Sequence, residues 1–375
     1  MRLRVSDVLD RGLTPGGRVT WFTNLIYTAI TYVAALGDAC AFVGHNAMLR
    51  WSAIQVSASY TDEDGYEKFW SESHVSEDFD MALRLQMSGY ALRYVSYMGD
   101  GFKEGVSLTV YDELARWEKY AYGCNELLFH PLRHWPRRGP FTKLFREFFW
   151  SGAVALPKKI TICSYIGTYY ALAGVWLGTL TNYFVTGWYK SILDHFYMDS
   201  FALYVTIVAV FTGLSNLSLA VYRFRRKEKG LLPACTCPLP PLFRRGTAAN
   251  GATSDFENLK WVPMFAVFLG GISLHVSQAI LSHFFEVDMA WGATAKEVDD
   301  VPFGVEVMRI LRRFRYTFLI CLAATALMLA GAFAFPEEDD RRITAFYTVY
   351  PLAITVICHF ALPLLLNPAL MRFTW

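Results

Sequence analysis

The sequence contains five long runs without Asp, Glu, Lys or Arg, and these runs restrict the possible folds more than any other feature. They cover residues 160–188, 200–222, 261–285, 316–335 and 343–371. A helix of about 20 apolar residues crosses the roughly 30 Å hydrocarbon core of a bilayer, so each run is long enough to span it. The chain is 54% hydrophobic and only 18% charged, whereas a soluble protein is typically about 25% charged. These observations predict an all-α transmembrane region in a multi-pass integral membrane protein.

The run at 261–285 differs from the other four because it contains two histidines, a glutamine and several serines. Basic residues flank it on both sides, at 223–260 and 309–315. Basic flanks favour the cytosolic side of a membrane, so we expect this run to lie flat or to re-enter. The acidic "PEEDD" at 336–340 is then expected outside. The prediction is four spans in two transmembrane hairpins, at 159–222 and 316–375, separated by a flexible cytosolic loop at 223–260 and an interfacial or re-entrant segment at 261–315.

The part of the chain that precedes these runs is more polar. Residues 1–140 have ordinary charge and mixed helix and strand patterns, which are typical of a soluble α/β domain on the cytosolic side. The segment 141–158 follows, and Phe141, Leu144 and Phe148 share one face of its expected helix while the charged residues lie elsewhere. A basic amphipathic helix of this kind belongs in the headgroup plane, so we predict an interfacial helix.

Two features of the whole chain argue against a nucleic-acid-binding protein and against a disulfide-stabilised protein. A formal net charge of +2 argues against a nucleic-acid partner, because such proteins have a strongly basic face. Seven cysteines without metal-type spacing fit reduced thiols better than a disulfide framework.

The stretch "HVSEDFDMALRLQMSGYALRYVSY" at 74–97 combines a helix start with a cluster of acids. Ser76 is a good N-cap residue, and acids in a first turn are stabilised by the free amides and the helix dipole. Gly89 is placed to end the helix, and 90–97 has the composition of a strand. A capped helix start explains the acids structurally, and a rigidly held carboxylate also suits proton transfer. The two interpretations are compatible.

These residues carry a resemblance to a known family. "FVGHNAMLRWSAI" at 42–54 and "VSEDFDMALRLQMSGYALRYV" at 75–95 resemble segments of the membrane-embedded family 2 glycosyltransferases, which include cellulose, chitin and hyaluronan synthases. The amino-acid sequence of these segments is most similar to fungal-type members. The resemblance implies a partial GT-A-like nucleotide-diphospho-sugar transferase domain, in which Asp78 is the catalytic base beside Glu77, and His45 and Asn46 contact substrate. It also implies sugar transfer with inversion from a nucleotide-sugar donor to a glycan acceptor, as in polysaccharide synthesis.

A Q-x-x-R-W motif is expected next, and it matches this chain in two registers. "ELARW" at 113–117 keeps Arg116 and Trp117, whereas "RWEKYAYG" at 116–123 aligns Arg116, Lys119 and Tyr120 with the glutamine, arginine and tryptophan. Either register supplies a cation for the diphosphate and an aromatic face for the acceptor sugar. The alternative is that these aromatic residues only pack the helix.

A third match lies downstream, in "MAWGATAKEV" at 289–298. It resembles the F-x-V-T-x-K gating loop of cellulose synthases, with Trp291, Thr294 and Lys296 at the corresponding positions. The resemblance implies that Lys296 neutralises donor diphosphate. A lysine that extends to lipid headgroups is the alternative.

The D-x-D motif that holds a divalent Mg or Mn ion in the complete enzymes has no counterpart before residue 42. "DED" at 62–64 follows the G-x-N-A turn and is expected to be a solvated turn, so no metal ligands are assigned. We therefore expect an N-terminally truncated family member, whose protein partner is a missing N-terminal half or a second copy in a homo-oligomer. The alternative function is a catalytically inactive membrane protein or scaffold. The sequence leaves the plasma membrane and the Golgi equally open.

Overall fold

The computed structural model describes residues 47–57, 60–61, 65–71, 74–93, 109–189, 194–214, 217–218, 221, 257–289, 302–337, 339–365 and 367. The chain divides into two compact units. The described residues of unit 1 lie within Thr23–Gly174 and Leu274–Lys296, and those of unit 2 lie within Val175–Ser273 and Glu297–Trp375.

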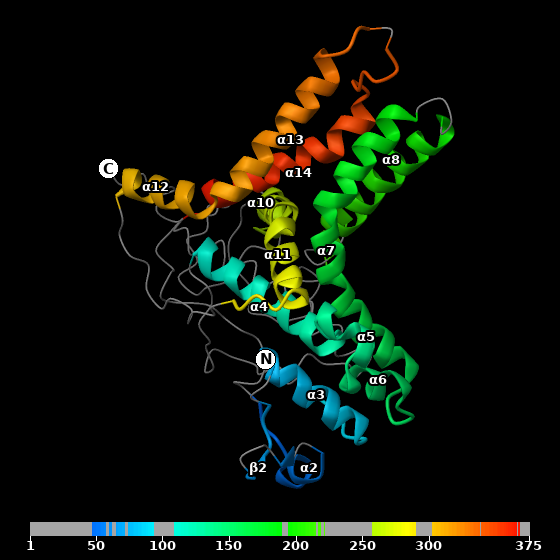
Figure 1. The fold of residues 1–375 in the computed structure, drawn as a ribbon, viewed down its shortest axis with the longest axis vertical. Helices are drawn as coiled ribbons and strands as arrows, with labels where there is room; N and C mark the ends of the chain where they lie inside the picture. The colour runs from blue at the N-terminus through cyan, green and yellow to red at the C-terminus, as the bar shows by residue number, and fades with distance from the viewer. Residues whose placement is uncertain are drawn as a thin grey trace, which may run out of the picture. The chain divides into compact units, whose positions relative to one another are not determined.

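Unit 1 is built mainly from helices (Figure 1). They are α2 (Trp51–Ser57), α3 (Glu77–Met87), α4 (Val110–Leu128), the 3-10 turn Leu132–His134, α5 (Trp135–Arg138), α6 (Lys143–Trp150), the first part of α7 (Leu156–Trp188), and α11 (Ser273–Phe284) from residue 274. Helix α6 packs against both α3 and α4. The described part of unit 1 therefore has a helical core.

Strands make up very little of the described residues. The strands β1 (Tyr60–Thr61) and β2 (Glu67–Lys68) form one antiparallel pair, in which Tyr60 is opposite Lys68. The α/β class expected for 1–140 is not confirmed, because so short a pair cannot form the layer of a sheet domain. Of the strand expected at 90–97, residues 90–93 have no regular structure and the rest lie outside the described residues.

Helix α3 begins and ends as the sequence predicts. Ser76 is at the N-cap position, although its side chain makes no capping hydrogen bond, and Glu77, Asp78 and Asp80 occupy the first turn. Met81 and Leu85 face inward and form a core with Ala53 of α2. Gly89 has a φ of 86°, which a residue with a side chain rarely adopts, and its amide bonds to the Gln86 carbonyl at 3.0 Å. The acidic first turn is thus held by a buried helix with a defined end.

Helix α6 lies within the segment predicted to be interfacial. The Thr142 hydroxyl caps it by accepting a hydrogen bond from the Phe145 amide at 3.2 Å. Phe148 is fully buried, whereas Lys143 and Trp150 are exposed. The helix is therefore amphipathic, and its position in the headgroup plane stays a prediction.

The regular secondary structure of unit 2 is entirely helical within the described residues. After the second part of α7 it contains α8 (Asp194–Val208), a π-helical turn (Ala209–Leu214), α10 (Glu257–Gly271), α12 (Phe303–Arg313), α13 (Arg315–Phe333) and α14 (Phe346–Leu365). Helix α14 packs against both α10 and α13 (Figure 1). The approach to α10 is close, because a Cβ atom on Gly271 would lie 2.7 Å from the Cys358 carbonyl oxygen. Glycine therefore sets the spacing of these two helices.

Four helical segments are long and apolar enough to cross a membrane. They are Leu156–Trp188, Pro263–Phe284, Arg315–Phe333 and Phe346–Leu365. Three of them lie on runs that the sequence analysis assigned to spans. Within the described part of the run at 200–222, the apolar helix Met198–Val208 is shorter than a span. The four candidates support a multi-pass membrane protein.

The segment Pro263–Phe284 is the one that the sequence analysis expected to lie flat or to re-enter. Its length and composition also suit a span. It consists of α10 and α11, which are interrupted at Ile272. The re-entrant arrangement, the domain boundaries and the cytosolic side of the N-terminal domain stay predictions.

Candidate functional site

The N-terminus of α3 lies directly on α4. A Cβ atom added to Gly123 would come within 2.0 Å of the Ser76 hydroxyl oxygen, so only glycine allows this approach. Three residues further along α4, the Glu126 carboxylate accepts a hydrogen bond from the Val75 amide at 2.7 Å. These two contacts hold the residues immediately before Asp78.

Asp78 is partly buried in the first turn of α3. Its Oδ1 atom accepts a hydrogen bond from the Phe79 amide at 2.8 Å. Burial and the negative charge of Asp78 raise the pKa of the Cys124 thiol on α4, which places the carboxylate near that side chain. Glu77 occupies the same turn and is also partly buried. The two candidate acids therefore lie where α3 meets α4.

An aromatic group adjoins this acid. Phe79, the residue after Asp78, makes an edge contact with Tyr165 of α7 at 5.9 Å between ring centroids. The hydroxyls of Tyr165 and Tyr169 are 2.9 Å apart, and Trp117 of α4 contacts Tyr169 edge-on at 6.0 Å. Tyr169 is buried, whereas Tyr165 is 42% exposed and offers a ring and a hydroxyl to a sugar.

The candidate residues on α4 have different surroundings. The Trp117 indole nitrogen donates a hydrogen bond to Glu113 at 3.1 Å, and Arg116 forms an ion pair with the same carboxylate at 3.5 Å. Lys119 is partly buried, whereas the Tyr120 side chain is 41% exposed. Of these side chains, the tyrosine is the most accessible to a substrate.

The structure thus brings Asp78 and Trp117 together around Tyr165 and Tyr169, which the sequence analysis missed. The signal that could have found these tyrosines is their spacing of four residues in "YIGTY", which places both on one face of a helix. The predicted site residues His45, Asn46, Trp291, Thr294 and Lys296 lie outside the described residues.

Asn125 is a second residue that the sequence analysis missed. It is completely buried, and its side-chain amide donates to the Ile280 carbonyl at 3.3 Å and lies 2.7 Å from Nδ1 of His283, both on α11. Its oxygen accepts a hydrogen bond from the Tyr170 hydroxyl of α7 at 2.6 Å. One side chain therefore connects three helices of unit 1.

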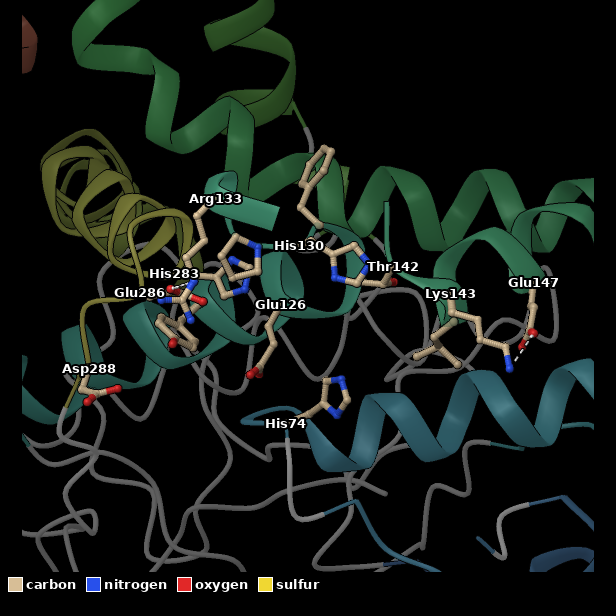
Figure 2. Close-up of a pocket in the computed structure, with 14 residues that line it drawn as sticks. His74, Glu126, His130, Arg133, Thr142, Lys143, Glu147, His283, Glu286 and Asp288 are labelled. Carbon is tan, nitrogen blue, oxygen red and sulfur yellow. Dashed lines mark ion pairs between the residues drawn. The ribbon is translucent and has the colours of Figure 1, made fainter. Parts of the chain in front are cut away.

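Part of α4 borders a cavity of about 830 Å³ (Figure 2). Its polar lining includes His74, Glu126, His130 and His283. Figure 2 shows Glu126 extending from α4 toward the segment that carries His74. Burial raises the pKa of Glu126 to about 7, against the opposing effect of the hydrogen bond from Val75, and burial lowers the pKa of His74. The cavity therefore has an acid that titrates near neutral pH next to the residues leading into α3.

In the described part of the chain, the side chains near Asp78 do not form a ligand set for the divalent metal expected for a complete family enzyme. Among the residues that the structure describes, no three His, Cys, Asp or Glu side chains are grouped to hold a metal ion. The nearby carboxylates have other partners, since Asp80 forms an ion pair with Arg84 and Glu126 bonds to the main chain.

Comparison with known proteins identifies one family. The family model described as glycosyl transferase family group 2 matches residues 6–216, which is 211 of the 375 residues. The match includes Asp78, α4 and the aromatic residues at the start of α7. No curated protein and no solved structure matches the chain.

Proposed function

We propose that this chain, which belongs to glycosyl transferase family group 2, transfers a sugar from a nucleotide-sugar donor to a glycan acceptor at a membrane. The family match and the four apolar helical segments fit a membrane glycosyltransferase. Inversion at the sugar, polysaccharide synthesis and a cellulose, chitin or hyaluronan synthase-like subtype are finer parts of the same proposal. The observation that carries it is an acid in the first turn of α3, held against α4 beside an aromatic group.

In this proposal Asp78 is the general base. Its carboxylate takes the proton of the acceptor hydroxyl while that oxygen forms a bond to the anomeric carbon of the donor sugar. The bond between this carbon and the diphosphate oxygen breaks, and its electrons leave with the nucleoside diphosphate. The helix N-terminus favours negative charge in this turn, and the contacts of Gly123 with Ser76 and of Glu126 with Val75 fix the residues just before Asp78. A positioned base of this kind contributes about 10² to 10⁴ in rate.

The acceptor sugar is proposed to stack on α4. Tyr120 is the exposed aromatic residue, and Trp117 lies one turn earlier against Tyr169. The position of Gly123 supports the register "RWEKYAYG", because the small residue that ends this pattern is the one that contacts Ser76. Lys119 then supplies a cation for the diphosphate, whereas Arg116 already pairs with Glu113.

The test is Asp78→Asn in membranes that contain the full-length gene product, assayed against a panel of sugar nucleotides. We expect turnover to fall by at least about 10² while donor binding stays nearly unchanged, because the amide keeps the shape but cannot take a proton. Asp112→Asn is the matched control, since Asp112 occupies the first turn of α4 and accepts a hydrogen bond from Thr109. Wild-type turnover in Asp78→Asn would remove this residue from the mechanism. A folded wild-type protein that turns over no donor would favour the non-catalytic scaffold.

A further inference from the structure

A strongly basic segment connects α4 to α7. Between residues 133 and 159 it has one acid, Glu147, and the basic residues Arg133, Arg137, Arg138, Lys143, Arg146, Lys158 and Lys159. The whole chain has a net charge of only +2. This segment is therefore a local concentration of positive charge immediately before a candidate membrane span.

Three of these cations already have partners. Arg133 forms an ion pair with Glu286, and Lys143 pairs with Glu147 at 3.7 Å, as the dashed lines in Figure 2 show. Lys159 donates hydrogen bonds to the carbonyl oxygens of Phe149 and Ser151 at the end of α6. The helix terminus, and not an acid, is therefore the partner of Lys159.

Arg137, Arg138 and Arg146 are different. All three are exposed, and no acid among the described residues forms an ion pair with them. Two of them act on the same neighbour, because burial and the charges of Arg138, His134 and Arg146 lower the pKa of His130. The three arginines thus present positive charge to the surroundings of the protein.

Exposed apolar side chains accompany these arginines. Trp150 is 81% exposed at the end of α6, and Phe149 beside it is 46% exposed. Leu156 and Ile160 are exposed at the beginning of α7, where the apolar span starts. Cations and aromatic residues together at the end of a span are typical of the membrane–water interface. Such apolar surface is stabilised when lipid covers it.

We infer that Arg137, Arg138 and Arg146 bind the headgroups of anionic phospholipids, with Phe149 and Trp150 inserted beside them. A basic segment next to a span attracts acidic lipids, and each cation contributes roughly a five-fold factor in affinity. The exposed aromatic residues and the continuity with α7 favour a bilayer over a soluble polyanion. This inference does not depend on glycosyl transfer, so a failed activity assay leaves it intact.

The experiment measures lipid selectivity in the full-length protein, reconstituted in phosphatidylcholine bilayers. Spin-labelled phosphatidylglycerol and spin-labelled phosphatidylcholine are added separately, and the protein-associated fraction of each is obtained by electron paramagnetic resonance. We expect a several-fold preference for phosphatidylglycerol that weakens when salt is raised from about 0.05 to 0.5 M, because screening shortens the range of charge attraction.

The variant Arg137→Gln/Arg138→Gln should lose most of this preference. Arg341→Gln/Arg342→Gln is the matched control: it also removes two adjacent arginines, but these already pair with Asp339 and Glu337. If the double variant does not fold, the single variant Arg146→Gln is measured in its place, because it removes only one charge. Equal association of the two lipids with the wild-type protein would overturn the inference. An equal loss of preference in the control pair would overturn it too.

Discussion

At the scale of single residues, Glu126 connects α4 to the segment just before α3, which lies far away in the sequence. It is on α4, and its carboxylate accepts the hydrogen bond of the Val75 amide, 51 positions earlier in the chain. Burial and this hydrogen bond act in opposite directions on its pKa, and burial prevails, so the pKa lies at about 7. The residue that holds the segment before Asp78 therefore changes charge near physiological pH.

The raised pKa of Glu126 predicts that the stability of the folded protein depends on pH. The folded-state pKa is above the model-compound value of 4.5. The folded protein therefore binds more protons than the unfolded chain between pH 4.5 and 7, and the contribution of Glu126 to stability is present below 4.5 and lost as the pH rises through 7. Across this window the loss is at most about 3 kcal/mol.

Glu126→Gln removes the titration but keeps an oxygen that accepts from Val75. Thermal unfolding of the purified protein at several values between pH 5 and 8 should show a flatter slope in this variant than in the wild type. Glu126→Ala should also be less stable at pH 5, because the Val75 amide loses its partner. The same slope in wild type and Glu126→Gln would show that another group is responsible.

At the scale of helices, the arrangement around α4 depends on buried polar contacts as well as on apolar packing. Asn125 bonds to α11 through Ile280 and His283 and to α7 through Tyr170. His275 of α11 also lies 3.1 Å from the Glu118 carboxylate of α4. The face of α4 that carries Trp117 and Tyr120 is thus oriented by contacts with two apolar helices.

Asn125→Leu is expected to destabilise unit 1 strongly. Leucine has a similar size but leaves the Tyr170 hydroxyl and Nδ1 of His283 without this partner, and each unsatisfied buried group costs about 1–3 kcal/mol. Tyr170→Phe removes one hydrogen bond of the same set and should have a smaller effect. Thermal unfolding in the same detergent compares the two. A smaller effect of Asn125→Leu than of Tyr170→Phe would contradict this role of Asn125.

At the scale of the whole molecule, the number of spans depends on the segment formed by α10 and α11. Length and composition allow it to cross, whereas basic residues on both sides favour two cytosolic ends. Both ends carry acidic residues that can be replaced by cysteine, Glu257 at the start of α10 and Asp288 after α11. The two arrangements are therefore distinguishable by labelling.

The prediction is that single cysteines at 257 and 288, in a background without the seven native cysteines, react with a membrane-impermeant thiol reagent only from the cytosolic side. A cysteine at Glu337 should react only from the opposite side, because it lies in the acidic link between α13 and α14. It also serves as the control for membrane integrity. Labelling of position 288 only from outside would show that the segment crosses the membrane.

The sequence by itself determined the features that depend on neighbouring residues. An uncharged run of about 20 residues predicts an apolar helix wherever it occurs, and all four candidate spans lie on such runs, three of which the sequence analysis assigned to spans. The bounds of helix α3 were also predictable, because the serine at the N-cap position, the acidic first turn and the terminal glycine lie within a few residues of the helix ends. The α/β class was not confirmed, since residues 90–93 have a strand-like composition but no neighbouring strand in the described part of the chain.

Only the tertiary structure decided which residues adjoin Asp78. The contacts of Gly123 with Ser76, of Glu126 with Val75 and of Asn125 with His283 join positions tens to more than a hundred residues apart. Composition and periodicity show which face of a helix is buried, but they do not show which helix covers it. Tyr165 and Tyr169 lie in a segment whose composition resembles that of any apolar span. They become part of the candidate site because α7 packs beside Phe79 and Trp117. The physical reason is that close packing and buried hydrogen bonds depend on the distance between atoms of separate elements, which a local pattern does not contain.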